Sequence, residues 1–261
     1  MNLELKDKVI IVTGGAKGIG EGIVRQLAGE GAIPVIVGRN EADNLNLLHQ
    51  VKALGQQCFQ VVAELTKPQA VAAAIASVVA AFGRIDGLVN NAGVNDGIGL
   101  ENGSYEGFME SLHKNVVHYY LMAHHALPYL KQSKGSIVNI GSKVAETGQG
   151  GTSAYAASNG ARNALTREWA VELLPYGIRV NAVIVAECYT PLYESWINTL
   201  PEPEKKLKAT VQKIPLEQRM TTATEIADMT IFLLSGKSSH TTGQLIHVDG
   251  GYVHLDRSVS P

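Results

Sequence analysis

The sequence predicts an α/β protein in which helices cover both faces of one parallel sheet. Short runs rich in valine and isoleucine alternate with longer segments of helical periodicity along the whole chain. A glycine-rich turn directly follows the first of these runs. The 261 residues, 45% of them hydrophobic, can bury one large core, and no linker rich in Ser, Gly or Pro divides them. We therefore expect a single domain spanning residues 1–261.

The order of the elements predicts a doubly wound sheet of seven strands. The expected strands are the runs 9–13, 34–38, 58–62, 87–90, 136–140, 179–185 and 244–248. The clearest helices, with apolar residues three and four apart, are 18–30, 68–82, 108–131, 152–174 and 224–235. Between them, region 190–220 combines several prolines with two short helical stretches. We expect this region to lie over the carboxyl edge of the sheet as a substrate lid.

Composition and charge favour a small molecule as the partner. The formal net charge is -2 and no long run of like charges occurs, so nothing predicts binding to nucleic acid or to an anionic membrane. The first residues lack the pattern of a signal peptide, and no apolar stretch reaches the roughly 18 residues of a membrane span. The two cysteines, Cys58 and Cys188, are expected to be free thiols. These observations predict a soluble, cytoplasmic protein.

Segment 13–20 is a turn that can hold a dinucleotide. It reads Thr-Gly-Gly-Ala-Lys-Gly-Ile-Gly and leads from the first strand into a helix. Gly14 permits a tight turn, Gly18 lets the backbone approach a pyrophosphate, and Gly20 permits close packing of helix on strand. Free amides at the start of a helix attract phosphates. The alternative, a merely tight turn, explains the position after the first strand less well, so we expect a Rossmann-type site that includes Lys17 and Ile19.

Further motifs follow the later strands in a regular order. They are Asn90-Asn91-Ala92-Gly93 after the fourth strand, Asn115 in a long helix, Ser142 after the fifth strand, Tyr155 on the next helix, and Asp249-Gly250-Gly251 near the end. With the glycine turn, these motifs resemble the short-chain dehydrogenase/reductase family over essentially the whole chain. The resemblance implies hydride transfer between a nicotinamide and a substrate hydroxyl.

The resemblance also implies roles for individual residues. Ser142 would hydrogen-bond the substrate oxygen, Tyr155 would exchange its proton, and Asn115 would help to hold a water relay. The implied cofactor contacts beyond the turn are Glu64, Leu65, Asn91, Ala92, Gly93 and Thr190. Glu64 departs from the family, which usually has Asp at this position.

A second departure concerns the proton acceptor. In the family, a lysine one helical turn after the tyrosine lowers the tyrosine pKa, about 10 when unperturbed, and binds the nicotinamide ribose. Asn159 stands at this position; it can bond ribose hydroxyls but carries no charge. Two cations could substitute: Arg162, on the same helical face as Tyr155, and Lys143, which follows Ser142. Helical geometry favours Arg162, and the alternative is that Arg162 lies on the surface or at a subunit interface.

The end of the second strand favours NADP over NAD. The residues there are Gly38-Arg39-Asn40. No carboxylate is present to repel a 2′-phosphate, and the Arg39 guanidinium suits a phosphate. The alternative is that Arg39 stacks on the adenine of either cofactor.

Polar residues after strand ends indicate a sugar or polyol substrate. The candidate substrate contacts are Asn95, Asp96, Gln149 and Glu187. Segments 90–99, 147–150, 190–193 and 251–257 further resemble bacterial L-fucose dehydrogenases, which oxidise the anomeric carbon of an aldose to a lactone. A lactol hydroxyl is more acidic than an ordinary alcohol, so a weaker base would suffice. The alternatives are a reductase of another small carbonyl compound and a non-catalytic NAD(P)-binding sensor or partner subunit.

Two further expectations concern metals and assembly. Four histidines lie on or near helix 108–131 without a paired cysteine or acidic ligand, so we expect no metal site: His113, His118, His124 and His125. The long helices 108–131 and 152–174 resemble those that pair across subunits in the family. We expect a homo-dimer or homo-tetramer.

Overall fold

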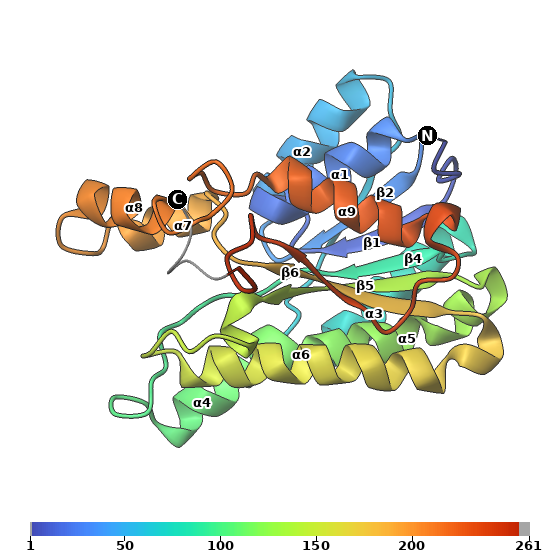
Figure 1. The fold of residues 1–261 in the computed structure, drawn as a ribbon. Coiled ribbons are helices and arrows are strands. Elements are labelled where there is room, and N and C mark those ends of the chain that lie inside the picture. The colour runs from blue at the N-terminus through green and yellow to red at the C-terminus, as the bar shows by residue number, and fades with distance from the viewer. Residues whose placement is uncertain (1, 256–261) are drawn as a thin grey trace.

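One seven-stranded parallel sheet forms the centre of the molecule (Figure 1). The computed structural model describes residues 2–255; Asp256 and Arg257 of the tail considered above lie outside the described residues. The strands are β1 (Val9–Thr13), β2 (Ile33–Gly38), β3 (Phe59–Val62), β4 (Gly87–Asn90), β5 (Ser136–Ser142), β6 (Arg179–Val185) and β7 (Leu245–Val248). Their order is β3-β2-β1-β4-β5-β6-β7. This order confirms the predicted doubly wound α/β class.

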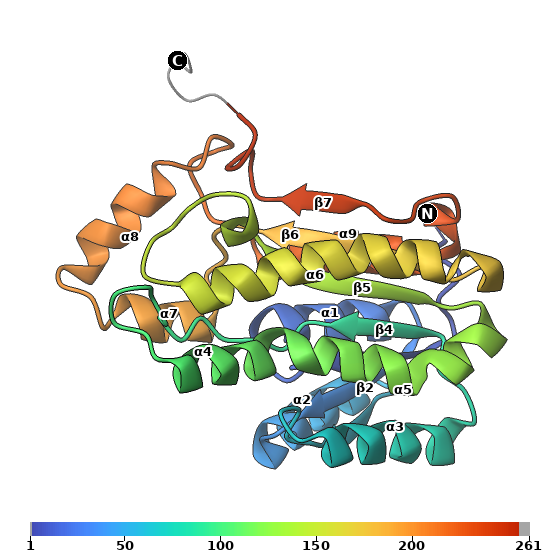
Figure 2. The same cartoon turned by 90° about the horizontal axis from the view of Figure 1, so that it is seen from below.

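Helices cover both faces of the sheet in two layers, and the helices of region 190–220 lie beyond these layers (Figure 2). The helices are α1 (Gly18–Gly29), α2 (Glu41–Ala53), α3 (Pro68–Phe82), α4 (Tyr105–Leu112), α5 (His118–Ser133), α6 (Ser153–Glu172), α7 (Pro191–Ile197), α8 (Pro203–Val211) and α9 (Ala223–Leu234). Helices α1, α2 and α9 pack on one core, whereas α3, α5 and α6 pack on the other. Within residues 2–255, no helix has both the length and the apolar composition to cross a bilayer.

Strand β1 shows why the sheet is central. All five of its residues are buried. Because successive side chains point to opposite faces, Ile10 and Val12 join the core under α1, whereas Val9 and Ile11 join the core under α3. The continuous apolar runs in the sequence therefore correspond to strands that are covered by helices on both faces.

Two elements differ from the sequence-based expectation in ways that matter for the site. Strand β5 continues to Ser142, two residues beyond the predicted end. The predicted helix 108–131 is longer and consists of α4, a π-helical turn (His113–Val117) and α5. A π-helical turn changes which backbone carbonyls are bonded within the helix, and periodicity of side chains does not reveal it.

Helices α7 and α8 lie at the carboxyl end of the strands (Figure 2). Both begin with proline, Pro191 and Pro203, whose missing N–H is tolerated at the first helical position. Thr190 caps α7 by accepting a hydrogen bond from the Tyr193 amide at 3.2 Å. The region 190–220 therefore has the place and the two short helices that its sequence predicts.

The packing of α1 against the glycine turn predicts the effect of Gly20→Ala. A Cβ at Gly20 would lie 2.1 Å from the Gly14 carbonyl oxygen. The helix and the turn must then separate, at a cost of about 1–3 kcal/mol. We expect a lower free energy of unfolding, measured in urea, and a loss of dinucleotide binding, measured by fluorescence titration. Gly29→Ala, in the same helix with its nearest atom at 4.0 Å, is the control. Equal behaviour of the two variants would contradict this account.

Candidate active site

The glycine turn and the segment after β4 form one hydrogen-bonded unit. The hydroxyl of Thr13 accepts hydrogen bonds from the amides of Asn91 at 2.9 Å and Ala92 at 3.1 Å. In return, the Asn91 amide nitrogen Nδ2 donates to the carbonyl oxygens of Thr13 at 2.9 Å and Gly14 at 3.2 Å. The side chain of Asn91 therefore shapes the turn. Two predicted cofactor segments, far apart in the sequence, lie side by side.

Close backbone approach at two glycines brings further predicted residues to this unit. A Cβ at Gly18 would lie 3.3 Å from Thr190, at the start of the region with α7 and α8. A Cβ at Gly93 would lie 2.8 Å from Arg162 Nη2 and 2.9 Å from Asn115 Oδ1. Any larger residue at position 93 would push on this pair, which explains the glycine after the Asn-Asn-Ala motif.

The residues after β2 and β3 form a charged rim. Arg39 is largely exposed, and its Nη1 lies 3.7 Å from Glu64 Oε2. Glu64 also accepts hydrogen bonds from the Thr66 amide and hydroxyl. Burial opposes ionisation of Glu64, but the bonds from Thr66 and the attraction of Arg39 outweigh burial and lower its pKa. Lys17 Nζ pairs with Asp43 at 2.8 Å.

Two other predicted cofactor residues are apolar supports. Leu65 is buried in the core under α3, and Ile19 packs against the core under α1. Their side chains anchor the backbone at the edge of the sheet.

The predicted catalytic residues come from neighbouring elements. Ser142 is the last residue of β5, and its hydroxyl faces the Val144 amide at 3.5 Å. Tyr155 is half-buried near the start of α6. Asn159 follows one helical turn later and is fully buried, and its Nδ2 donates to the Tyr155 carbonyl oxygen at 2.9 Å.

Arg162 connects the elements that carry the predicted catalytic residues. Its side chain is only 3% exposed, so the surface alternative is wrong. Arg162 Nη1 donates to Asn159 Oδ1 at 3.0 Å and to the Ile140 carbonyl oxygen at 3.2 Å. Arg162 Nε donates to the Asn115 carbonyl oxygen at 2.7 Å, within the π-helical turn. The guanidinium carbon also lies 4.3 Å from the centre of the Tyr119 ring.

The side chain of Asn115 is fully buried and organises the loop after β4. Its Oδ1 accepts the Val94 amide at 2.8 Å, and its Nδ2 donates to the Ser111 carbonyl oxygen at 3.0 Å. The Ser111 hydroxyl donates to Asp96 at 2.8 Å. A chain of polar contacts therefore leads from Arg162 through Asn115 to the predicted substrate residue Asp96.

Lys143 and Glu187 form a second polar cluster at this end of the sheet. The two side chains, 9% and 12% exposed, make an ion pair. Lys143 Nζ lies 3.9 Å from the centre of the Tyr252 ring. Burial, then the negative Glu187, raises the pKa of Tyr193 on α7. Glu187 balances the charge of Lys143, whereas the hydrogen bonds of Arg162 described above are to neutral groups.

The remaining candidate residues lie nearer solvent or outside this network. Gln149 is exposed. Within the described part of the chain, the Asn95 side chain makes one hydrogen bond, which its Oδ1 accepts from the Gly97 amide at 3.4 Å. Ser111 is not singled out by the sequence, and Tyr193 and Tyr252 are included only within segments 190–193 and 251–257, without an assigned role. Periodicity assigns Ser111 to a helix, and only the folded chain brings Tyr252 beside Lys143.

The comparisons with known proteins agree with this geometry. Residues 14–253 match the family model described as Enoyl-(Acyl carrier protein) reductase. The chain is 33% identical to L-fucose dehydrogenase of Bos taurus over 96% of its length and 91% of that protein. The chain belongs to the short-chain dehydrogenase/reductase family. It is an oxidoreductase of this family, whose members use NAD(P) and a small-molecule substrate.

Relatives in the family differ in substrate. The chain is 36% identical to 3-oxoacyl-[acyl-carrier-protein] reductase of Thermotoga maritima over 96% of this chain and all of that protein. Among solved structures, Cj0485 dehydrogenase is 43% identical with a TM-score of 0.94, and each chain is fully covered. Aldohexose dehydrogenase of Thermoplasma acidophilum is 30% identical with a TM-score of 0.89 over 99% of both chains. The L-fucose dehydrogenase reported above is an animal protein, whereas the motifs in the sequence predict a resemblance to bacterial L-fucose dehydrogenases.

The buried His118 beside Arg162 predicts a pH dependence of stability. Burial, then the positive charge of Arg162, lowers the pKa of His118 to about 3, far below the usual value near 6.5. The unfolded chain therefore binds a proton below about pH 6.5 that the folded chain excludes until about pH 3. The contribution of His118 to the free energy of unfolding is therefore fully present above about pH 6.5 and is lost progressively as the pH falls towards 3.

We therefore expect the free energy of unfolding to decrease by about 1–2 kcal/mol more in the wild type than in His118→Gln between pH 7 and 5. Urea denaturation at the two pH values measures the difference. Parallel losses in both proteins would mean that His118 is protonated in the folded state.

Proposed function

We propose that this protein is an NADP-dependent dehydrogenase that oxidises the anomeric carbon of an aldose, such as L-fucose, to its lactone. The buried Lys143–Glu187 ion pair carries the proposal. If the site bound an apolar substrate, burying two charges there would cost desolvation energy that no interaction with the substrate offsets. A sugar presents hydroxyl groups that donate to Glu187 and accept from Lys143. The names of the bovine and Thermoplasma relatives agree with this substrate class.

Each proposed catalytic residue has a separate task. Ser142 donates a hydrogen bond to the oxygen on the anomeric carbon, and Tyr155 removes the proton of that hydroxyl. The bound nicotinamide supplies the hydride acceptor. Arg162, which contacts Asn159 one turn from the tyrosine, provides the positive charge that favours a phenolate. Asn115 holds the loop that lines the substrate side.

The cofactor preference follows from the rim after β2. Arg39 is exposed and has one weak ion-pair contact, to Glu64 at 3.7 Å, among the described residues. Its fork of donors is therefore available for a 2′-phosphate. Lys17, at the N-cap of α1, adds a second positive charge on this rim, partly balanced by Asp43. The cofactor residues proposed here are those predicted from the sequence.

A ketone reductase is the second candidate. The family model and the Thermotoga relative are both described as reductases of acyl-carrier-protein substrates. NADP as cofactor suits reduction as well as oxidation. Turnover of a 3-oxoacyl thioester with NADPH, without turnover of any aldose, would replace the sugar proposal by this one.

We also propose a cytoplasmic homo-dimer or homo-tetramer. The long helices leave apolar side chains on the surface: Tyr120 on α5, Val171 on α6 and Leu174 just beyond it. Burial of such a face against a second copy is favourable. Two free cysteines in the described chain agree with a reducing compartment. Analytical ultracentrifugation that finds only a monomer would overturn the assembly.

Arg39→Ala tests the cofactor preference. Loss of a guanidinium that binds phosphate is expected to raise the KM for NADP at least tenfold, because a charge-assisted bond contributes about 1.5–3 kcal/mol. The KM for NAD, which lacks the 2′-phosphate, is expected to change less than threefold. Steady-state kinetics with both cofactors measure the two ratios. If wild-type protein prefers NAD more than tenfold, the preference for NADP is wrong.

A panel of aldoses tests the substrate. We expect NADPH formation with L-fucose, D-arabinose or L-galactose, followed at the absorbance of the reduced cofactor. Glu187→Gln keeps the shape of the side chain but removes the charge, and we expect it to raise the KM for the sugar about tenfold with little change in the KM for NADP. Cofactor binding without turnover of any sugar or carbonyl compound would favour the non-catalytic sensor instead.

A further inference from the structure

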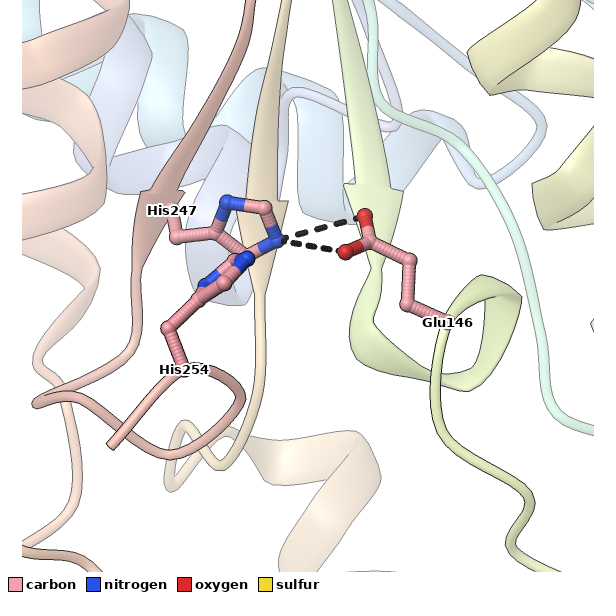
Figure 3. Close-up of side chains that lie close together, drawn as sticks. All are labelled: Glu146, His247 and His254. Carbon is pink, nitrogen blue, oxygen red and sulfur yellow. Dashed lines mark hydrogen bonds and ion pairs between the residues drawn. The ribbon is translucent and has the colours of Figure 1, made fainter. Parts of the chain in front are cut away.

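Three potential metal ligands from distant parts of the chain meet beside β7 (Figure 3). Glu146 directly follows a short 3-10 helix (Lys143–Ala145) after β5, His247 belongs to β7, and His254 lies in the segment after β7. One ligand atom from each residue lies within 4.8 Å of the others. None of the three is among the catalytic or cofactor residues discussed above. We propose that Glu146, His247 and His254 bind a divalent cation of the zinc class, which fastens the C-terminal segment to the edge of the sheet.

The donor set suits such a cation. Two imidazoles with one carboxylate form a common three-residue zinc set and leave one position for water. Zinc lies about 2.0–2.2 Å from such donors, so the donors of a tetrahedral site lie about 3.3 Å apart. His247 Nε2 is already 3.2 Å and 3.1 Å from the two carboxylate oxygens of Glu146. Only His254 must approach, by roughly 1.5 Å, and its exposed side chain has room to do so.

The surroundings leave Glu146 and the two rings available. The ring of His254 stands edge-on to that of His247, with centres 4.4 Å apart and planes at 85°. Among the described residues, the ion-pair partner of Glu146 is His247 itself, and the nearby Lys143 is paired with Glu187. The side chains of His247 and Glu146 remain 16% and 28% exposed, so an ion can enter from solvent.

The Asp249-Gly250-Gly251 motif explains how His254 returns to β7. The Asp249 carboxylate accepts the Gly251 amide at 2.8 Å and the Val253 amide at 3.0 Å. Gly250 and Gly251 have φ angles of +62° and +81°, which side chains disfavour. The turn folds the segment back beside the sheet. The same segment places Tyr252 over Lys143. A metal at this site therefore also holds Tyr252 beside Lys143, part of the ion pair on which the proposed function rests.

Calorimetric titration of the metal-stripped full-length protein with Zn²⁺ tests the site. We expect one equivalent per chain, and we expect His254→Asn and His247→Asn each to weaken binding at least tenfold. His49→Asn removes an exposed histidine on α2 and serves as the matched control, with unchanged binding. Since His254 is exposed, its replacement is compatible with folding. Absent binding, or equal binding by the triple variant Glu146→Gln/His247→Asn/His254→Asn, would overturn the proposal.

Two further measurements separate this site from the cysteines and test its effect. Burial raises the pKa of Cys58 to about 11 and of Cys188 to about 12, so neither thiol is ready to bind metal. Bound Co²⁺ should show tetrahedral ligand-field bands without a thiolate charge-transfer band, and such a band would overturn the assignment. Zn²⁺ should slow amide hydrogen exchange in residues 249–255 of the wild type at least tenfold but not in His254→Asn. Unchanged exchange would overturn the fastening role.

Discussion

The buried guanidinium of Arg162 is the constraint on which the candidate site depends. It bonds to a carbonyl of the π-helical turn, a carbonyl of β5 and the side chain of Asn159 on α6. Ser142, Tyr155 and Asn115 lie on the same three elements. Loss of the guanidinium removes its hydrogen bonds to the Asn115 and Ile140 carbonyl oxygens, and the Tyr119 hydroxyl still donates to Ile140. Among the described residues, no carboxylate lies within 4.0 Å of the guanidinium to form an ion pair. A cation held by neutral groups keeps its field, which reaches His118 and Tyr119.

Much of the fold follows from local patterns in the sequence. The buried run of β1, the turn of glycines after it and the periodicity of α6 each depend on neighbouring residues, so they are visible without tertiary information. The bounds of β5 and the π-helical turn are not visible in this way. The side-chain pattern of a π-helical turn hardly differs from that of an α-helix, and only the contact of Arg162 with the Asn115 carbonyl reveals its use.

The candidate site is predictable to a smaller extent. Helical spacing places Arg162 on the face of Tyr155, but spacing cannot show that its partners are backbone carbonyls. Lys143 and Glu187 are 44 residues apart, and Glu146 and His247 are 101 residues apart. Such pairs form because parallel strands end at the same edge of the sheet. The sequence therefore indicates which residues reach that edge, whereas the fold decides which of them meet.

The most direct test of the central role of Arg162 is the pH profile of kcat. Arg162→Gln is expected to move the pH of half-maximal kcat upward, because the positive charge that contacts Asn159, one helical turn from Tyr155, is lost. Asn159→Lys/Arg162→Gln restores a lysine and removes the guanidinium that would repel it, and should return the profile. Arg162→Lys, which keeps the charge but not the bonds, should lower the melting temperature yet leave the profile in place. An unmoved profile in folded, NADP-binding Arg162→Gln, or a moved one in Arg162→Lys, would contradict the account.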